Sequence, residues 1–303
     1  MFDAVGIGRC CLDYLALVDG FPAENSKVRA LRHAVEGGGQ SSTAMAALSR
    51  LGLAAAFVGV VGDDPEGVLV LDGLAAAGVD VSRVRVAPGI RTPVAQIVIN
   101  TRRRSRTIVY SDSAPHLLDA LPCPLDLLAG AGCLMVDPFG TGLGLRTAPG
   151  ARAAGVPVVY DLEHTAEGVG GMIAASDYVI GSRDSLALLG LDRPEAALRE
   201  LMRRGCRRAA VVTLGEEGSV GTDGASVRRQ RAFPVDAVDT TAAGDAYHAG
   251  FAYGVVRGWD LPECMEFAAA VGALVCREVG GRKSLPTLAE VERLLAGSGS
   301  GGA

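Results

Sequence analysis

The stretch Asp239-Thr240-Thr241-Ala242-Ala243-Gly244-Asp245 places two hydroxyl side chains and a turn of small residues between two acids. The apolar residues 246–256 follow directly and can form a helix. A turn of small residues that leads into a helix carries unpaired backbone N–H groups, and the positive end of the helix dipole adds to their attraction for anions. We therefore predict that the backbone of Ala242, Ala243 and Gly244 binds phosphate or another anion.

Asp245 lies at the mouth of this predicted anion cradle. A carboxylate is out of place beside a bound anion unless it accepts a proton, so Asp245 is a candidate general base. The alternative is that Asp245 is an N-terminal helix cap. The local pattern alone leaves both interpretations open.

Strand-like and helix-like segments alternate through the rest of the chain. Buried strands are predicted at residues 2–7, 55–61, 133–136, 156–161, 178–180 and 209–214. Helices are predicted at residues 41–51, 66–77, 146–154, 185–189, 194–204, 241–257, 262–275 and 288–295. This alternation predicts an α/β fold whose mostly parallel central sheet is covered by helices on both faces.

Two segments break the alternation and predict a small second sheet. Residues 12–35 and 92–111 have strand-like patterning without an intervening helix, and the second of them reads as a hairpin of residues 94–99 and 106–110. The basic cluster of residues 102–104 and Arg106 is then most simply a solvated hairpin tip.

Composition restricts the classes of function. A chain of 303 residues suits one large α/β domain or two small ones. The net charge of -5 argues against nucleic-acid binding, and no apolar run is long enough to span a membrane. Seven cysteines without CxxC spacing indicate free thiols in a reducing cytoplasm, and the four histidines are too scattered for a metal site. We expect a cytoplasmic protein without a signal peptide.

Familiar nucleotide-binding motifs are incomplete. Gly6 and Gly8 follow a predicted strand, but the third glycine of a dinucleotide fingerprint is missing. Residues 281–284 lack the glycine that precedes the lysine of a P-loop. The triplet Gly37-Gly38-Gly39 before a predicted helix is either a backbone site for a ligand or a tight turn.

Several polar residues have similarly open interpretations. Residues 213–218, Thr-Leu-Gly-Glu-Glu-Gly, form either a turn over a nucleotide or a hairpin. Asp13, at the end of the first strand, is either a ligand group or a capping residue. Lys27 is a solvated lysine unless it faces the cleft.

Four blocks, in this order along the chain, resemble the PfkB (ribokinase-like) family of carbohydrate and nucleoside kinases. The run from Asp239 to Gly250 looks like the family's Asp-Thr-x-Gly-Ala-Gly-Asp signature, and residues 38–52 look like its N-terminal signature. Residues 59–67 and 212–218 are similar to further blocks. The resemblance implies one ribokinase-like domain over residues 1–296, with three α/β/α layers and a small β-sheet lid near residues 12–35 and 92–111. Residues 297–303 are predicted to be a disordered tail.

The resemblance also implies a reaction, the transfer of the ATP γ-phosphoryl group to a hydroxyl group, with magnesium accompanying the nucleotide. Asp245 would take the hydroxyl proton, and Ala242, Ala243 and Gly244 would stabilise the phosphate charge. The implied roles of other residues fall into three groups. The acceptor would be held by Asp13, Gly38, Gly39 and Thr43, joined by Lys27; ATP by Ser182, Thr213, Gly215, Gly218 and Gly244; and a monovalent cation such as potassium by Asp239 and Thr241. A homodimer through the lid is also implied.

Three departures from the family pattern affect the predicted site. Thr43 stands where many members have Asn, and Ala242 replaces the first glycine of the anion turn. A side chain at Ala242 is opposed if that turn needs a positive φ. The family's Asn-x-x-Glu block near the phosphates is Ser182-Arg183-Asp184-Ser185 here, where Asp184 is a candidate substitute.

The sequence favours an ATP-dependent sugar kinase, and the triplet of glycines with residues 280–286 is similar to the sulfofructose-kinase-like branch. Two alternatives remain open. One is a nucleoside kinase of the adenosine type. The other is a ligand-binding protein on the same fold that no longer catalyses transfer.

Overall fold

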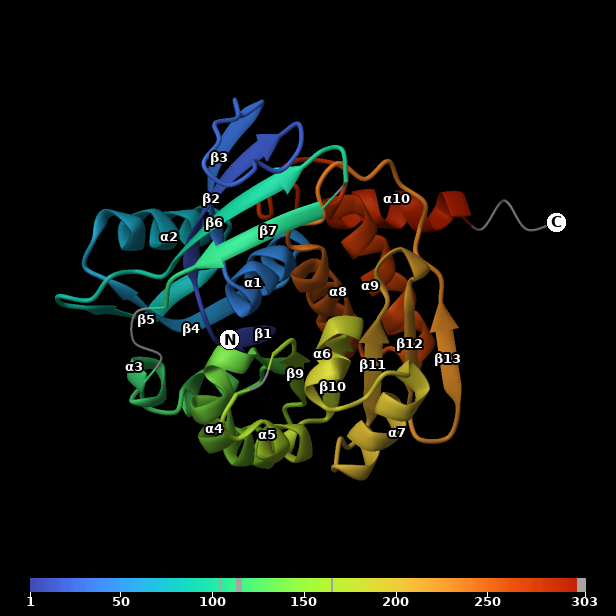
Figure 1. Cartoon of the computed structure of the whole chain (residues 1–303). Coiled ribbons are helices and arrows are strands. Elements are labelled where there is room, and N and C mark those ends of the chain that lie inside the picture. Colours follow the sequence, from blue (N-terminus) through green and yellow to red (C-terminus); the bar gives the residue numbers. More distant parts are fainter. Residues whose placement is uncertain (104, 113–115, 165, 299–303) are drawn as a thin grey trace.

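Two sheets organise the chain in the computed structural model, which describes residues 1–103, 105–112, 116–164 and 166–298 (Figure 1). The large sheet has nine strands in the order β13-β12-β11-β10-β9-β8-β1-β4-β5. Its strands are β1 (Ala4–Ile7), β4 (Ala55–Gly62), β5 (Asp80–Ala87), β8 (Cys133–Val136), β9 (Val158–Leu162), β10 (Tyr178–Ser182), β11 (Ala209–Thr213), β12 (Ser219–Thr222) and β13 (Val227–Gln230). All neighbours pair in parallel except β11 with β12 and β12 with β13, which confirms the mostly parallel sheet.

Helices cover both faces of this sheet and bury separate hydrophobic clusters. One face carries α1 (Gln40–Arg50), α2 (Pro65–Ala76), α8 (Ala243–Arg257), α9 (Leu261–Val275) and α10 (Leu288–Ser298). The other carries α4 (Thr141–Ala153), α5 (Val169–Ala175), α6 (Arg183–Leu188), α7 (Pro194–Arg203), the short α3 (His116–Asp119) and the 3₁₀ turn η1 (Leu125–Leu128). The predicted three-layer α/β/α fold is therefore confirmed. None of the described helices is long and apolar enough to cross a membrane.

The small sheet lies over one end of the large one and forms the predicted lid (Figure 1). Its strands, in the order β3-β2-β6-β7, are β2 (Cys11–Val18), β3 (Arg32–Gly38), β6 (Val94–Asn100) and β7 (Ser105–Tyr110). The hairpin of β6 and β7 is confirmed, with Ile97 opposite Ile108. Its inner face packs Leu15, Ile97 and Ile99 around Val279. Alternating apolar side chains explain this arrangement, because only one face of each strand can be buried.

Several elements differ from the sequence prediction. Strand β5 has exposed residues at half of its positions and lacks an apolar run, and the alternation of arginine and valine over residues 83–86 was not predicted as a strand. Helix α5 contains two glycines, which are poor helix formers. Gly37 and Gly38 belong to strand β3, so the turn before α1 consists of Gly39 alone, with φ 97°. Helix α10 continues to Ser298, so residues 297–298 are helical; the rest of the predicted tail, residues 299–303, lies outside the described residues.

Candidate active site

A cavity of about 230 Å³ lies between the lid and the carboxyl ends of the central strands. Strands β1 and β8 are neighbours at this edge, and the order of the sheet runs outward from them in both directions. Such a switch point is where open α/β sheets bind ligands. The lid contributes Asp13, Arg106 and Tyr110 to the wall of the cavity, and the start of α8 contributes Gly244 and Asp245.

Asp245 faces this cavity from the first turn of α8. Its carboxylate accepts no hydrogen bond from the part of the chain that the structure describes, and α8 has no side-chain cap, so the capping interpretation is wrong. Burial raises the pKa of Asp245 well above its ordinary value; the charge of Glu163 raises it further, while Arg106 lowers it. A carboxylate that is free of protein donors and holds protons more tightly than usual has the properties of a general base.

The turn before Asp245 supplies N–H groups, with one correction to the sequence prediction. Ala243 donates its N–H to the carbonyl of Thr240 at 3.2 Å, so this group is already paired. The N–H groups of Ala242, Gly244 and Asp245 have no acceptor among the described residues. A Cβ on Gly244 would meet no atom within 4 Å, so an anion has room beside it. The cradle is therefore formed by Ala242, Gly244 and Asp245.

Ala242 adopts the left-handed conformation that the sequence analysis identified as unfavourable. Its φ is 60° and its ψ is 8°. Asn25 is the other non-glycine residue with positive φ in the described ranges, and asparagine tolerates this region better than alanine does. The turn therefore forms with a side chain present, at a cost in backbone strain.

The three glycines Gly37, Gly38 and Gly39, which join strand β3 to helix α1, each make room for a different group. A Cβ on Gly37 would overlap the guanidinium of Arg282, and one on Gly38 would overlap the carboxylate of Asp13. Gly39 has φ 97° and lies against the carbonyl of Arg9. The triplet therefore serves close packing of polar side chains as well as the turn.

Asp13, predicted to hold the acceptor, lies in the cavity wall opposite Glu36 of β3. Its single side-chain partner among the described residues is the thiol of Cys11, which donates to Oδ1 at 3.2 Å. Burial raises the pKa of Asp13, whereas Arg282 and Arg9 lower it. Its oxygens are available to substrate hydroxyl groups.

Thr43 does not reach the cavity wall, although it was predicted to hold the acceptor. It is buried in α1, and its hydroxyl accepts a hydrogen bond from Nε of Arg282 at 3.4 Å. The same guanidinium donates to the carbonyl of Gly38 at 2.9 Å and to Ser42 Oγ at 2.8 Å. Thr43 therefore acts with Arg282 beneath the glycine turn, and Arg282 is a site residue that sequence reasoning missed.

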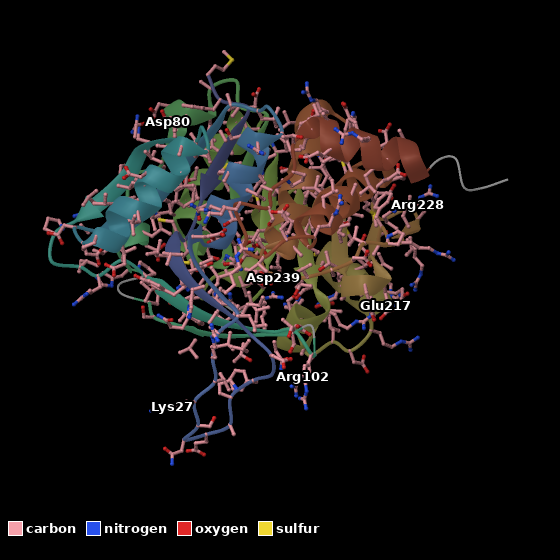
Figure 2. The ribbon with its side chains drawn as sticks, turned by 90° about the horizontal axis from the view of Figure 1, so that it is seen from above. Lys27, Asp80, Arg102, Glu217, Arg228 and Asp239 are labelled. Atoms are coloured by element: carbon pink, nitrogen blue, oxygen red, sulfur yellow. The ribbon has the colours of Figure 1, made fainter. Side chains whose placement is uncertain are left out.

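Lys27 lies away from the other predicted acceptor residues. It is exposed on the loop between β2 and β3, which Figure 2 shows projecting beyond the body of the protein. Lys27 is not part of the cavity wall in this structure. This position agrees with the solvated-lysine interpretation, and its role as an acceptor ligand stays a prediction.

Arg106 also differs from its prediction. At the tip of the hairpin, Arg102 pairs with Asp19 at 2.8 Å in solvent, as expected; Arg104 lies outside the described residues. Arg106, in contrast, lines the cavity and donates from Nη1 to Thr240 Oγ1 at 2.8 Å. The lid thereby contacts the turn that precedes the anion cradle.

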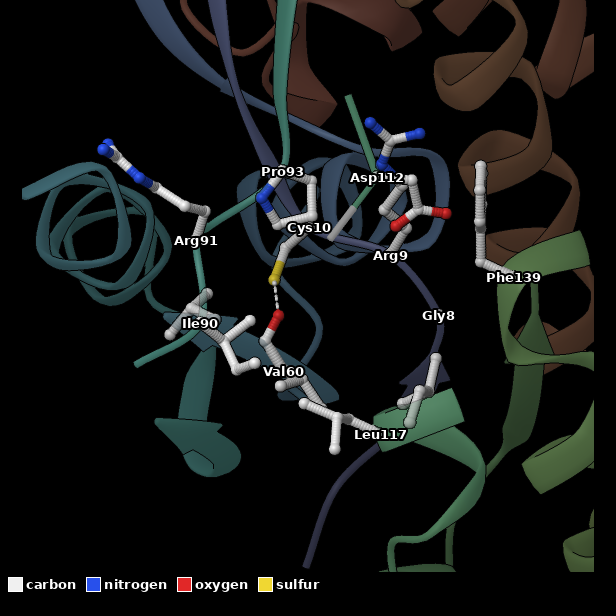
Figure 3. Close-up of a pocket in the computed structure, with 12 residues that line it drawn as sticks. Gly8, Arg9, Cys10, Val60, Ile90, Arg91, Pro93, Asp112, Leu117 and Phe139 are labelled. Carbon is white, nitrogen blue, oxygen red and sulfur yellow. Dashed lines mark hydrogen bonds between the residues drawn. The ribbon is translucent and has the colours of Figure 1, made fainter. Parts of the chain in front are cut away.

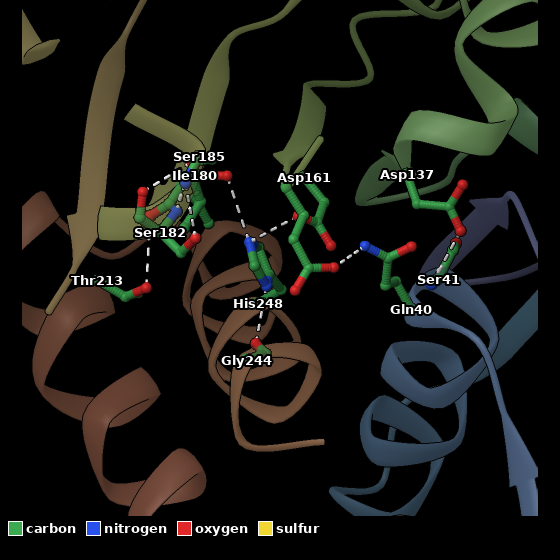
Figure 4. A network of polar contacts seen from close by, with 12 residues as sticks. Gln40, Ser41, Asp137, Asp161, Ile180, Ser182, Ser185, Thr213, Gly244 and His248 are labelled. Atoms are coloured by element: carbon green, nitrogen blue, oxygen red, sulfur yellow. Dashed lines mark hydrogen bonds and ion pairs between the residues drawn. The ribbon is translucent and has the colours of Figure 1, made fainter. Parts of the chain in front are cut away.

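The residues predicted to bind the nucleotide lie at the ends of β10 and β11. Ser182 caps α6 through reciprocal bonds with Ser185, and Thr213 donates to the carbonyl of Gly181 at 3.4 Å (Figure 4). Asp184, the candidate substitute in the lost Asn-x-x-Glu block, is exposed. The polar groups of this block therefore cap a short helix.

Gly215 and Gly218 both have positive φ, but they differ in the space available for a side chain. Gly215 has φ 62°, and a Cβ there would meet open space. Gly218 has φ 98°, and a Cβ there would lie 2.7 Å from the backbone nitrogen of Ala232. The hairpin interpretation of residues 213–218 is confirmed, because β11 and β12 pair in antiparallel fashion. The nucleotide interpretation stays a prediction, for which the open space over Gly215 leaves room.

Asp239 and Thr241, predicted as cation ligands, are bonded to each other. Asp239 Oδ1 accepts from the N–H of Thr241 at 2.9 Å and from its hydroxyl at 2.7 Å, and Oδ2 accepts from the N–H of Gly280 at 3.0 Å. No group of three His, Cys, Asp or Glu side chains placed to hold a metal occurs among the described residues. Asp239 therefore fixes the turn before α8 to the loop that carries Arg282.

A polar network behind the cradle was not predicted (Figure 4). His248 Nδ1 lies 2.7 Å from the carbonyl of Gly244, so this nitrogen carries the proton and donates it. Its Nε2 lies 3.4 Å from Asp161 Oδ1. Burial lowers the pKa of His248, and burial raises the pKa of Asp161 well above its ordinary value. Nε2 also lies 3.4 Å from the carbonyl of Ile180, so the ring of His248 ties the first turn of α8 to β10.

A second buried acid joins the strand ends to α1. Asp137 follows β8 and accepts hydrogen bonds from the N–H groups of Arg9, Ser41 and Gly140 at 2.9, 3.2 and 3.0 Å. Burial raises the pKa of Asp137 to about 6, although these bonds oppose the shift. Asp137 and Asp161 carry a sequence signal that could have identified them, because both lie at the carboxyl ends of predicted buried strands.

One further wall of the cavity is cationic and aromatic. The guanidinium of Arg9 lies between the rings of Tyr110 and Phe139, 4.7 Å from each centroid. Phe139 in turn contacts the ring of His164 at 4.7 Å. Arg9 and Phe139 also line a smaller cavity of about 40 Å³, shown in Figure 3. Arg9 follows the Gly6-x-Gly8 pattern directly, but nothing in that pattern indicates its partners.

The sequence model described as "pfkB family carbohydrate kinase" matches residues 1–288. The chain is 27% identical to a 5-dehydro-2-deoxygluconokinase of Geobacillus kaustophilus, over 97% of this chain and 93% of the relative. It is 26% identical to a nucleoside kinase of Methanothermobacter thermautotrophicus, over 97% and 96% of the two chains. Its structure is similar to the crystal structure of a candidate ribokinase from Agrobacterium tumefaciens, with a TM-score of 0.92 and 30% identity over 98% of both chains.

Proposed function

We propose that this chain, which belongs to the pfkB family of carbohydrate kinases, transfers the γ-phosphoryl group of ATP to a hydroxyl group of a sugar or sugar derivative. The single observation that carries this proposal is Asp245. Its carboxylate accepts no hydrogen bond from the described residues, faces the cavity beneath the lid and lies beside unpaired backbone N–H groups. Proton acceptor and anion site are thus adjacent, as phosphoryl transfer to an alcohol requires.

The chain's own residues have defined roles in this reaction. Asp13 accepts hydrogen bonds from acceptor hydroxyl groups, and Asp245 takes the proton of the hydroxyl that attacks the γ-phosphorus. The unpaired backbone N–H groups of Gly244 and Asp245 stabilise the negative charge on the transferred phosphoryl group. His248 holds the carbonyl of Gly244 and thereby fixes these N–H groups. The lid excludes water, which limits hydrolysis of ATP.

ATP fits the open space beside Gly244 and over Gly215, with Thr213 and Ser182 on adjacent strand ends. Gly218 supports the turn rather than the nucleotide, because its α-carbon is packed against β13. Magnesium neutralises phosphate charge when the nucleotide is bound. The described residues offer it no closed set of ligands, which suits an ion held mainly by phosphates and water.

The monovalent cation finds less support. Asp239 already accepts three hydrogen bonds from the backbone and from Thr241, so its carboxylate does not need a cation. We derive no step through potassium. A comparison of turnover in potassium and sodium buffers tests this part of the prediction.

A nucleoside as acceptor is the second candidate, favoured by the similarity to a nucleoside kinase. The charged side chains in the cavity wall favour a small polyhydroxylated molecule over a purine nucleoside. The sulfofructose-kinase-like branch stays a prediction of the sequence. An acceptor panel of sugars, sugar phosphates and adenosine separates these classes.

A ligand-binding protein without transferase activity is the remaining alternative, motivated by Ala242 and by the lost Asn-x-x-Glu block. It predicts that a ligand raises the melting temperature without ADP release. Turnover of ATP that depends on one acceptor would eliminate it.

Assembly and location also remain proposals. On the outer face of the lid, Val35, Tyr14, Gln96 and Val109 lie in register across the four strands, and Val35 and Val109 are 46% and 68% exposed. We expect this face to pair with a second copy, which light scattering of Val109→Asp against the native chain tests. The seven cysteines form no disulfide and six are buried, which suits a reducing cytoplasm.

The decisive experiment replaces Asp245 with asparagine. Coupled measurement of ADP release with the best acceptor should show kcat lowered roughly 10²–10⁴-fold, because removal of a general base typically has this effect. Asp236→Asn, an exposed acid on the same segment, is the matched control and should leave kcat within about twofold. A kcat for Asp245→Asn within tenfold of the native value would refute the assignment, provided both proteins melt at similar temperatures.

A further inference from the structure

Arg9 is held in place before any ligand arrives. Its backbone N–H donates to Asp137 at 2.9 Å, and its Nη2 donates to the carbonyl of Ser111 at 3.0 Å. Its guanidinium lies over the rings of Tyr110 and Phe139, 4.7 Å from each centroid. A planar cation fixed in this way needs little reorganisation to bind a ligand.

Most hydrogen-bonding capacity of Arg9 is unused. A guanidinium has five N–H donors, whereas the described residues provide one acceptor, the carbonyl of Ser111. Its Nε is buried and has no hydrogen-bond partner in the part of the chain that the structure describes. No carboxylate oxygen of the described residues lies within 4.0 Å of its nitrogens; this includes Asp112, which shares the smaller cavity with it (Figure 3). In contrast, Arg102 on the lid pairs with Asp19 at 2.8 Å.

Arg9 is half-buried, with its Nε fully buried, and a partly desolvated cation without a paired carboxylate among the described residues is costly; aromatic contacts offset only part of that cost. Solvent in the open cavity provides the rest, but lid closure around a neutral sugar would remove this water. An anionic group on the acceptor would instead fill the empty donors of Arg9. Among the described residues, the free donors of Arg9 thus form a candidate site for an anion.

The position of Arg9 separates this site from the reacting hydroxyl. Arg106 lies near the start of β7, whereas Arg9 contacts Tyr110 and Ser111 at the end of that strand. Arg106 is also bonded to Thr240, next to the anion cradle. Arg106 therefore belongs to the end of the cavity where transfer occurs, and Arg9 to the other end.

We propose that the acceptor carries an oxyanion group, a carboxylate, phosphate or sulfonate, and that Arg9 binds this group while Asp13 and Asp245 receive hydroxyl groups. This inference rests on the proposed kinase function and defines the class of its substrate. A different role for Arg9 is purely structural, since it joins Tyr110 and Ser111 of the lid side to Phe139 of the body. The two roles predict different behaviour toward neutral acceptors.

The test compares acidic acceptors with neutral counterparts in the native enzyme, Arg9→Met and Arg9→Lys. The pairs are gluconate with glucose, fructose 6-phosphate with fructose, and 6-deoxy-6-sulfofructose with fructose. They distinguish the three sources of the anion. Arg102→Met is the matched control, because Arg102 is on the lid but pairs with Asp19 outside the cavity. Melting temperatures show whether each variant is folded.

We expect one acidic acceptor to exceed its neutral counterpart by at least about 10²-fold in kcat/KM, and Arg9→Met to remove this preference mainly through KM, because loss of a buried charge pair typically costs this much. Arg9→Lys should restore part of it, and Arg102→Met should leave it unchanged. Best turnover with a neutral acceptor would overturn the inference and leave the kinase function standing. Equal losses on acidic and neutral acceptors in Arg9→Met would assign the structural role instead. No turnover with any acceptor would overturn both proposals.

Discussion

Replacing Ala242 with glycine should stabilise the protein, although glycine usually destabilises. Ala242 has φ 60°, in the left-handed region that costs an L-residue roughly 1–2 kcal/mol. Glycine removes this cost but loses about 0.5–1 kcal/mol through its greater freedom in the unfolded chain. The methyl group also packs near Gly281, where a Cβ would lie 3.1 Å from it, and this contact is lost. The balance is a gain of about 0.5 kcal/mol.

The neighbouring residue provides the matched control. Ala243 is the first residue of α8 and has ordinary helical geometry, so Ala243→Gly should destabilise by about 0.5–1 kcal/mol. Both variants remove one methyl group from the same turn and keep its N–H groups. Urea unfolding of the two variants and the native chain, with equal slopes, gives the two free energies of unfolding.

The sign of the difference decides the matter. A gain for Ala242→Gly beside a loss for Ala243→Gly would show that the anion turn carries backbone strain. Equal losses in both variants would refute this, since Ala242 would then behave as an ordinary helical residue. Turnover should persist in Ala242→Gly, because Asp245 and the unpaired N–H groups remain.

Three further predictions concern the surroundings of the site. Gly37→Ala should destabilise the protein by about 2–4 kcal/mol and raise the acceptor KM, because the new Cβ displaces the buried Arg282 guanidinium from the carbonyl of Gly38. Gly73→Ala is the control in the same urea unfolding assay and should be neutral or stabilising, because a Cβ there meets no other atom. Glu163→Gln should move the acid limb of the kcat/KM profile to lower pH. Burial and then the charge of Glu163 raise the pKa of Asp245, so removing that charge lets the base ionise at lower pH. An acid limb that stays in place or moves to higher pH would contradict this. Gly218→Ala should lose more stability than Gly215→Ala, because both have positive φ but only Gly218 also meets the backbone of β13; similar urea midpoints would argue against this.

Much of the fold could be read from the sequence because the signals are local. Apolar runs such as Cys133–Val136 and the alternation over Val94–Asn100 follow the periods of buried strands, and they were located correctly. The half-exposed strand β5 and the glycine-containing helix α5 escaped prediction, since neighbours stabilise them and not their own residue preferences.

The same distinction applies to the site. Small residues before a helix indicate unpaired N–H groups, so Gly244 could be identified from the chain alone. The local pattern marked Asp245 as a candidate base but did not distinguish a base from a helix cap, which the fold decided. Ala243 could not be excluded from the cradle, because its bond to Thr240 depends on the turn geometry. Lys27 was included on residue type, but its loop projects away from the cavity.

By itself, the sequence determined the layered α/β fold, the lid segments and the acid at the start of α8, because each depends on residues adjacent along the chain. Only the tertiary structure decided which distant side chains share the cavity. It brought Arg9, Arg106 and Arg282 from three separate segments to the surroundings of Asp13 and Asp245. It also showed that Ala242 occupies a left-handed turn. Contacts between residues a hundred or more positions apart form when the strand ends come together and the lid folds over them, and local sequence patterns do not predict these contacts.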